Sequence, residues 1–334
     1  MTNRERFRAV FNFERPDDRL PVAEWAPWWN VTVEAWNKQG LPEGLSWYEM
    51  ARYFDLDPNI YGRLTAISPD APTPKYNGGP IMEEGEEGYE KLLPYLYKDS
   101  TADGYVEFYR QLKPYHESGE VAVWYAMDGA FWFPRSLFGI EPHLYSFYDY
   151  PDLYKRITND LAEYQIKQLE RMYEIVTPEF MAVSEDMSYN NGPMISEDCF
   201  DEFLLPYYQK VVPFIKEHGT KVLLDSDGEV SKMIPWLQRA GIEGVMPLER
   251  KAGVDVAAIR EAYPDFLLFG AFDKMTMRES DEAMKKEFQR LLPVLKTGGF
   301  VPGVDHQTPP DCPLERYKKY VEMLKEYAVK AVKE

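Results

Sequence analysis

The fold is decided by a stretch at residues 221–249, which reads KVLLDSDGEVSKMIPWLQRAGIEGVMPLE. An apolar run at 221–227 predicts a strand, a helix-forming segment follows it, and a second apolar run at 244–248 predicts another strand. Two strands joined by a helix run parallel, because the helix returns the chain to the end of the sheet at which the first strand begins. Both runs end in acidic side chains.

The same alternation extends in both directions from this stretch. Further strand-like runs are found at 121–127, 180–187, 266–272 and 300–304. Amphipathic segments separate these runs, and the longest, at 150–176, carries apolar residues at helical spacing. Ser196 is a predicted helix cap, and apolar side chains at helical spacing from Leu314 to Ala328 predict a final helix. The carboxyl-terminal two thirds of the chain therefore contain six strand–helix units.

The amino-terminal third supplies the remaining units. Thr2 and Glu5 match a capping box that opens a first helix, residues 19–25 predict a strand, and residues 58–64 predict one more. Eight strand–helix units in one chain indicate an α/β fold, a closed (β/α)8 TIM barrel with an extended N-terminal region, forming a single domain over residues 1–334. The alternative is an open doubly wound sheet, but no G-x-G-x-x-G follows any predicted strand.

Composition narrows the functional classes. The chain has 334 residues, and its 56 acidic side chains outnumber the 38 basic ones, which gives a net charge of −18. This charge argues against a nucleic acid or an anionic membrane as partner. Two cysteines, no apolar leader and no long apolar run lead us to expect a cytoplasmic protein without a membrane span.

Aromatic residues are frequent, at 15% of the chain, and they gather in two places. The first group contains Trp25, Trp28 and Trp29, and the second contains Trp124, Tyr125 and the aromatic residues at 131–133. Core packing explains any one of these residues. The two groups together indicate the wall of a pocket for a flat or apolar ligand.

Acidic residues stand at the end of every legible strand. They are Glu24, Asp128, Glu185 with Asp186, Asp225 with Asp227, Glu249, Asp273, and Asp305 followed by His306. In a barrel of this kind the carboxyl ends of the strands carry the active site, so we expect these side chains at one mouth. Helix capping is the alternative for some of them, notably Asp273 and Asp128.

Asp225 and Asp227 are two residues apart on an extended segment, so their carboxylates point the same way and repel each other. Such a pair either binds a divalent metal or retains a proton for acid catalysis. His306 stands at a predicted strand end, and a histidine with carboxylates suits a catalytic zinc site. The histidines at 116, 143 and 218 fall in loop or helix contexts and are expected to face solvent.

Four segments together resemble the uroporphyrinogen decarboxylase superfamily. They are TNRERFRAVFNFERPDDRLPV at 2–22, SEDMSYNNGPMISEDCFDEFLLPYYQKVV at 184–212, KVLLDSDGEV at 221–230, and GVDHQTPPDCPLERYKKYVEML at 303–324. The resemblance implies a (β/α)8 barrel. It also implies one of two activities, the cofactor-free decarboxylation of a porphyrinogen or a zinc-dependent methyl transfer to a corrinoid.

Departures from the family pattern distinguish these branches. Where the decarboxylase carries arginines that bind substrate carboxylates, this chain reads EWAPWW at 24–29. Where the thiol-methylating enzymes carry a His-x-Cys zinc pair, this chain has Asp225 and Asp227, and the later cysteine position falls near Val304. An oxygen-rich zinc site polarises an ether oxygen better than a thiol.

The resemblance therefore favours an enzyme of O-demethylation, a metal-dependent methyltransferase that moves a methyl group from a small methoxylated aromatic to a corrinoid-binding protein. We expect Asp227, Glu249 and His306 as zinc ligands, Asp225 as a ligand or catalytic group, and Tyr125 and Tyr189 as orienting groups. The expected substrate-binding residues are Trp25, Trp28, Trp29, Trp124, Asp128, Glu185 and Asp186. The alternatives are a decarboxylase of a tetrapyrrole or other carboxylic acid, and a non-catalytic barrel that binds a corrinoid or tetrapyrrole.

Overall fold

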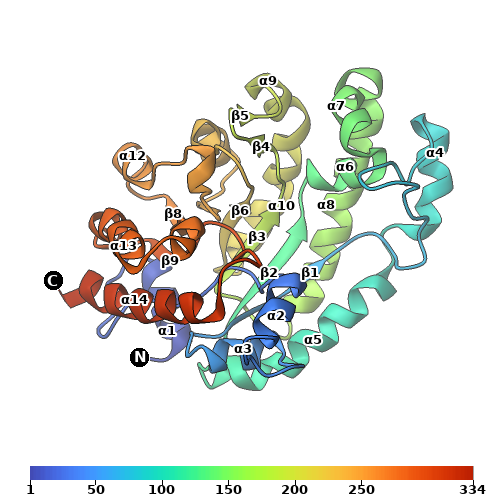
Figure 1. The fold of residues 1–334 in the computed structure, drawn as a ribbon. Coiled ribbons are helices and arrows are strands. Elements are labelled where there is room, and N and C mark those ends of the chain that lie inside the picture. Colours follow the sequence, from blue (N-terminus) through green and yellow to red (C-terminus); the bar gives the residue numbers. More distant parts are fainter. Residues whose placement is uncertain (334) are drawn as a thin grey trace.

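The computed structural model describes residues 1–333, and the last residue of the expected domain, 334, lies outside that range. Seven parallel strands form one curled sheet in the order β1-β2-β3-β6-β7-β8-β9 (Figure 1). Their bounds are β1 Asn59–Leu64, β2 Ala122–Asp128, β3 Phe180–Ser184, β6 Lys221–Asp225, β7 Gly244–Met246, β8 Leu267–Phe272 and β9 Phe300–Val304. The runs expected from 58 onward are therefore confirmed as strands, several of them shorter by a few residues at their ends.

Helices surround the curled sheet, as the outer coils in Figure 1 show. They are α1 Asn3–Phe11, α2 Asn30–Asn37, α3 Trp47–Tyr53, α4 Gly85–Leu92, α5 Asp99–Glu117, α6 Trp132–Phe138, α7 Ile140–Asp149, α8 Pro151–Tyr173, α9 Glu197–Cys199, α10 Leu205–Glu217, α11 Ile234–Arg239, α12 Val256–Ala262, α13 Asp281–Leu295 and α14 Leu314–Lys333. The caps at Thr2 and Ser196 form as expected, since each side chain accepts a backbone N–H in the first turn of its helix. A small hairpin, β4 Ser188–Tyr189 with β5 Gly192–Pro193, stands outside the main sheet.

Strand register aligns polar residues at one end of the sheet. Asp128 on β2 pairs with Ser184 on β3, and Ser184 pairs with Asp225 on β6. Register partners in a parallel sheet point to the same face, so these three side chains form one row. Earlier in the same strands the residues are apolar and buried, which is typical of strands covered on both faces.

The first expected strand, at 19–25, is not a strand in the structure. Residues 20–24 run extended between β9 and β1, but they are held by single contacts instead of a ladder. Asp57 N–H donates to the Val22 carbonyl at 2.7 Å, and Val304 N–H donates to Glu24 Oε2 at 3.1 Å. Within residues 1–333 the sheet thus has seven hydrogen-bonded strands, with residues 20–24 beside both of its edges.

Helix α1 covers the amino ends of the strands. Phe7 packs edge-on against Phe269 and Phe11 against Phe180, at centroid distances of 6.3 and 5.0 Å. Below them, Glu179 is fully buried and bonds to Arg4 on α1 at 2.9 Å. Packing and ion pairs therefore close this end of the sheet, and we expect the active site at the other end.

Two histidines expected to face solvent are buried instead. His116 on α5 lies 3.0 Å from the Glu179 carboxylate, and His143 on α7 lies 3.1 Å from the Tyr154 hydroxyl. Helical context gave the wrong prediction because these side chains lie on the inner faces of their helices, where partners distant in sequence bind them.

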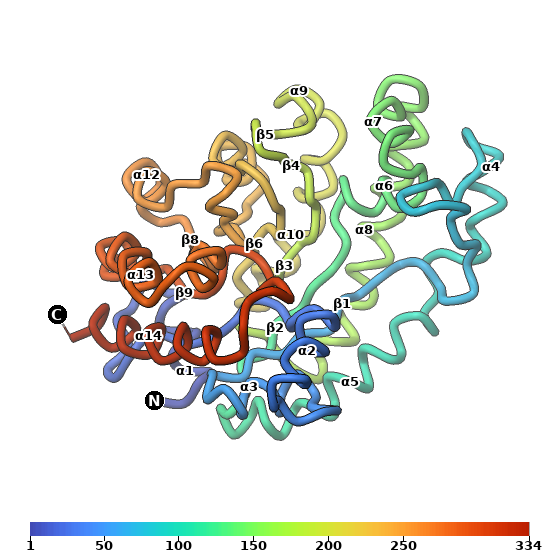
Figure 2. Tube along the Cα trace, viewed as in Figure 1, coloured from blue at the N-terminus to red at the C-terminus, as the bar shows by residue number. Residues whose placement is uncertain are grey.

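The amino-terminal segment also contacts the last helix. Leu20 N–H donates to the Ala328 carbonyl of α14 at 3.1 Å. Figure 2 shows both ends of the trace on the same side of the molecule. One continuous cluster of buried apolar side chains extends from Phe7 to Val332. No helix within the described range has the length and apolar character needed to cross a bilayer.

Candidate active site at the carboxyl ends of the strands

Asp225 is the central carboxyl group of the polar row. The Ser184 hydroxyl donates to its Oδ2 at 3.1 Å. Burial raises the pKa of Asp225 to about 7, and the nearby charges of Asp186 and Asp227 add to the effect. A carboxyl group with such a pKa holds or releases a proton near neutral pH, which is the property required of a catalytic acid.

Asp186 and Asp227 lie beside Asp225. Asp186 has a positive φ of 44°, which turns the chain sharply just after β3. Its Oδ1 accepts the Asp227 N–H at 3.3 Å. Burial raises the pKa of Asp186, and the Asp227 charge raises it further. The structure therefore brings together three of the expected strand-end acids.

His306 connects this acidic group to the tryptophans. Its Nε2 lies 3.3 Å from Asp227 Oδ2. The rings of Trp25 and Trp29 contact the imidazole edge-on, with centroids 6.1 and 5.4 Å away. Burial lowers the pKa of His306, but the hydrogen bond and charge of Asp227 outweigh that effect and raise it overall. The structure thus places the paired His306 and Asp227 side chains beside two indole rings.

The expected zinc ligands do not form a complete set. Asp227 and His306 are paired, whereas Glu249 Oε2 accepts the Gly228 N–H at 3.2 Å. Among residues 1–333 no group of three or more His, Cys, Asp or Glu side chains is arranged to hold a metal ion. In this arrangement the donor set does not fit zinc.

Two arginines at the same end were missed by the sequence reasoning. Arg63 on β1 reaches Asp128 on β2, with Nε 2.8 Å from Oδ1. Its guanidinium and that of Arg135 on α6 lie 5.2 and 4.9 Å from the centroid of the Trp132 ring. The sequence could have identified Arg63, because it shares a face with Tyr61 near the end of the strand predicted at 58–64. Nothing local identified Arg135.

Asp128 is therefore not a helix cap but the partner of Arg63. Burial raises the pKa of Asp128, against the opposing charge of that guanidinium. Asp273, in contrast, does cap the short helix that follows it, because its Oδ1 accepts the Met275 N–H at 3.0 Å. The capping alternative was correct for one of the two residues.

Three of the expected aromatic site residues belong to the core. Tyr125 points to the outer face of the sheet, where its hydroxyl donates to the Met172 carbonyl at 3.0 Å, so it cannot orient a substrate at the mouth. Trp124 stacks on Phe180 at 4.9 Å, four residues before the end of β2. Trp28 is buried and packs on the Tyr317 ring at 5.8 Å. These three expectations are corrected, because each side chain is buried in the core and packs there instead of facing the strand-end site.

The expectation that Glu185 binds the substrate is also corrected. Its carboxylate turns outward, away from Asp186, and accepts the N–H groups of Phe131 and Trp132 at 2.8 and 2.9 Å. Burial raises its pKa to about 7. Gly129 is required beside it, since a Cβ there would lie 2.1 Å from the Glu185 carboxyl carbon. Glu185 therefore anchors the start of α6 and does not face a substrate.

Two more strand-end acids are internal supports. Glu24 is almost fully buried and accepts the Val304 N–H and the Tyr317 hydroxyl, at 3.1 and 3.0 Å. Asp305 is fully buried and accepts the Arg250 N–H at 3.0 Å and the Lys274 ammonium at 3.2 Å. The expectation that all seven strand ends open onto one mouth is thus wrong for these residues.

Tyr189 lies on β4 and is about half exposed, at 48%. Its backbone lies against Gly228, because a Cβ on that glycine would approach Tyr189 N to 2.7 Å. The hairpin therefore packs directly on the loop that carries Asp227, and Tyr189 remains a candidate at the edge of the site.

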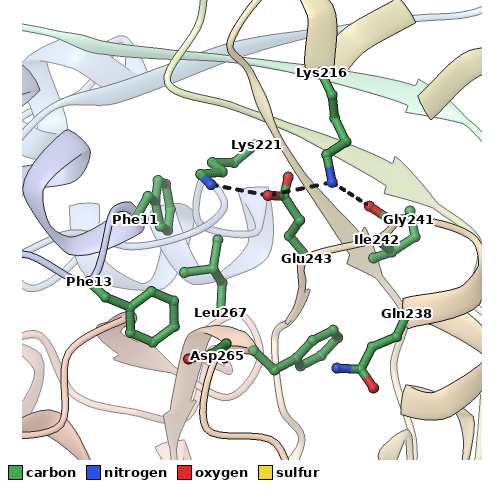
Figure 3. A pocket seen from close by; sticks show the side chains of 11 residues that line it. Phe11, Phe13, Lys216, Lys221, Gln238, Gly241, Ile242, Glu243, Asp265 and Leu267 are labelled. Carbon is green, nitrogen blue, oxygen red and sulfur yellow. Dashed lines mark hydrogen bonds and ion pairs between the residues drawn. The ribbon is translucent and has the colours of Figure 1, made fainter. Parts of the chain in front are cut away.

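A different cavity, of about 240 Å³, lies at the amino ends of the strands (Figure 3). Lys221 and Lys216 both turn toward Glu243, with Nζ–Oε1 distances of 3.1 and 3.7 Å. The carboxylate is shared by both ammonium groups, and the remaining wall includes Phe11 and Phe13. We assign Lys216, Lys221 and Glu243 to structural support, because both ammonium groups are paired with the Glu243 carboxylate.

Comparison with known proteins gives a consistent picture. A family model described as Uroporphyrinogen decarboxylase (URO-D) matches residues 81–327. No curated protein sequence matches the chain. A solved structure described as a methyltransferase from Methanosarcina mazei is similar with a TM-score of 0.65 and 17% identity, covering 98% of each chain. A B12-independent methionine synthase from Shewanella sp. W3-18-1 is similar with a TM-score of 0.46 and 10% identity, covering 67% of this chain and 66% of that one.

Proposed function

Because the chain belongs to the uroporphyrinogen decarboxylase family but has tryptophans where the decarboxylase carries arginines, we propose that it is a methyltransferase of O-demethylase type. It takes a methyl group from a small methoxylated aromatic and passes it to the corrinoid of a corrinoid-binding protein. The observation that carries the proposal is the position of Trp25 and Trp29, which flank the His306–Asp227 pair beside the Asp225 carboxyl.

This arrangement suits an aryl ether. Indole rings provide apolar walls for a flat substrate, and the adjoining acids provide a proton. The fold supports the proposal, since a protein described as a methyltransferase shares it over nearly the whole length.

The proton is assigned to Asp225. In the step, the bond between the methyl carbon and the ether oxygen breaks, and its electron pair stays on the oxygen. When bound, the partner's corrinoid would supply the electron pair that accepts the methyl group. The phenolate oxygen receives the proton of Asp225, whose pKa of about 7 allows it to carry one at neutral pH. The paired His306 and Asp227 side chains lie beside the leaving oxygen, and Tyr189 and Asp186 border the same space.

Zinc has no role in the proposed step, because the donors present do not fit it. Binding at His306 and Asp227 would require Glu249 to give up its bond to the Gly228 N–H. A demethylation that persists after treatment with a chelator would show that the acid works without a metal.

A second candidate function is a decarboxylase of another carboxylic acid. Arg63 favours it, because this arginine lies close enough to Asp225 to lower the pKa of that carboxyl, against the larger effect of burial. In a decarboxylation, the guanidinium binds the substrate, the substrate loses carbon dioxide, and the neighbouring acid protonates the carbanion that remains. Products distinguish the two candidates, since demethylation yields a phenol and decarboxylation yields carbon dioxide.

The test uses the purified chain with chemically reduced cobalamin in place of the partner's corrinoid. Methoxylated benzenes are supplied, and phenols are quantified together with the absorbance change of the cobalamin. We expect a phenol for every cobalamin methylated, and weak binding of a coproporphyrin-type tetracarboxylate. Carbon dioxide release without phenol would overturn the proposal in favour of the decarboxylase.

The proposed location is the cytoplasm. Cys199 and Cys312 are free and buried, as in a reducing compartment. We propose a small molecule and a corrinoid-binding protein as partners, and neither nucleic acid nor membrane.

A further inference from the structure

A cavity of about 310 Å³ lies beside the strand-end site, between the loop after β1 and helix α6. Its lining residues are Pro74, Asn77, Gly78, Gly79, Trp132, Arg135, Ser136 and Ile140. This volume is at the lower end of the range for small-molecule sites, which begins at roughly 300 Å³. Trp132 connects the cavity to the strand ends, because Arg63 lies over the same indole ring.

The charge of this cavity is unusual for so acidic a chain. It is lined by one guanidinium and by no carboxylate, although the chain carries a net charge of −18. Each of the four other cavities described has at least one aspartate or glutamate in its wall. The cavity beside α6 is therefore suited to an anion.

Arg135 has the donors to bind that anion. Its Nη1 donates to the Asp186 carbonyl at 3.3 Å, and its guanidinium lies over Trp132. Within the described part of the chain, no carboxylate lies within ion-pair distance of it. The charge of Asp186 acts on it only from beyond ion-pair distance. A half-buried guanidinium that is oriented by a carbonyl and an indole, and that forms no ion pair, fits a planar carboxylate from outside.

The remaining wall specifies what is attached to the carboxylate. Pro74 and Ile140 are apolar, and Asn77 and Ser136 are small and uncharged. Such a wall accepts a ring or short chain but offers no partner for a cation.

We propose that this cavity is the subsite for the carboxylate end of the substrate, with Arg135 as the residue that binds it, so that the substrate is a methoxylated aromatic acid. The inference rests on the proposed function for the methoxy end only. The acid end is held at Arg135, and the ring extends past Trp132 toward Arg63 and the strand-end acids.

The experiment measures binding of 4-methoxybenzoate and its neutral isostere 4-methoxybenzamide by titration calorimetry. One hydrogen-bonded ion pair lost from a binding site changes affinity by about tenfold or more. Wild type should therefore bind the acid at least about tenfold more tightly than the amide. Arg135→Gln should abolish that preference while leaving amide binding unchanged, and Arg135→Lys should restore part of it. Arg110→Gln, on the exposed face of α5, is the matched control and should behave as wild type.

A filling variant tests the place independently of charge. Ser136→Phe puts a ring into the cavity and should weaken the binding of both probes, with the melting temperature confirming that each variant is folded. An acid preference that survives Arg135→Gln overturns the subsite. Demethylation of neutral methoxybenzenes with no preference for acids also overturns it but leaves the proposed function standing. Acid binding lost in Arg135→Gln, without any phenol from the wild type, keeps the subsite and refutes the methyl transfer.

Discussion

Replacing Glu24 by glutamine tests whether ionisation of this buried carboxyl group, at the edge of the sheet, destabilises the folded protein. Glu24 is 3% exposed, and its two oxygens accept the Val304 N–H and the Tyr317 hydroxyl. Burial raises its pKa from an ordinary 4.5 to about 7. Glutamine has the same shape, retains an acceptor oxygen for the backbone N–H, and cannot ionise.

The direction in which stability changes with pH depends on whether the folded or the unfolded chain releases the Glu24 proton at lower pH. Below pH 4.5 both the folded and the unfolded chain hold it, and ionisation costs nothing. Between about 4.5 and 7 the unfolded chain releases it while the folded chain does not, so stability falls as the pH rises. Above 7 both are ionised and the whole cost is present. A shift from 4.5 to about 7, at about 1.4 kcal/mol per unit, corresponds to about 3 kcal/mol.

The assay is urea unfolding of wild type and Glu24→Gln at pH values from 4 to 8.5. The difference in the free energy of unfolding should move by about 3 kcal/mol in favour of glutamine across this range. Tyr317→Phe removes a donor that stabilises the ionised form, so the pKa of Glu24 should rise further and the stability should continue to fall to a higher pH than in wild type. Tyr115→Phe, exposed on α5, is the control for losing a tyrosine hydroxyl. A difference between wild type and Glu24→Gln that stays constant with pH would refute the reasoning.

Three further outcomes are expected. Asp225→Asn should slow methyl transfer by roughly a hundredfold or more and remove the decline of the wild-type rate above about pH 7, which rate profiles measure. Asp227→Asn should lower the pKa of His306, followed by NMR titration of its ring protons, and an unchanged titration would contradict the pairing. Glu179→Gln should destabilise the protein by about 2 kcal/mol in urea unfolding, because it removes the buried carboxylate that pairs with Arg4 and with the buried His116.

Local periodicity was sufficient to predict most strands. The run at 300–304 became β9, because burial on both faces makes a strand apolar throughout. The run at 58–64 became β1 although its middle residues, Tyr61 to Arg63, are only half-buried. Residues 19–25 failed for a reason that is not local. They have a strand-like composition, but residues 20–24 meet the edges of β1 and β9 through single bonds to Asp57 and Glu24.

The candidate site was likewise predictable only in part. The acids at 225 and 227 and the histidine at 306 follow predicted strands, so their meeting at one end was legible from topology. The zinc set predicted from the same residues did not form, because Glu249 binds a backbone N–H of the neighbouring loop. Ligand geometry depends on where each carboxylate finds its partner, and spacing along the chain does not encode it.

The sequence by itself determined the α/β alternation, the end of the sheet where acids gather, and the family. Only the tertiary structure decided which of those acids face outward into the site. Glu185 and Asp186 are adjacent, yet one binds the N–H groups of Phe131 and Trp132 while the other turns at a positive φ toward Asp227. Their directions are set by partners more than 40 positions away along the chain. Arg135 has a site for the same reason, since the loop that completes its cavity belongs to a different strand–helix unit.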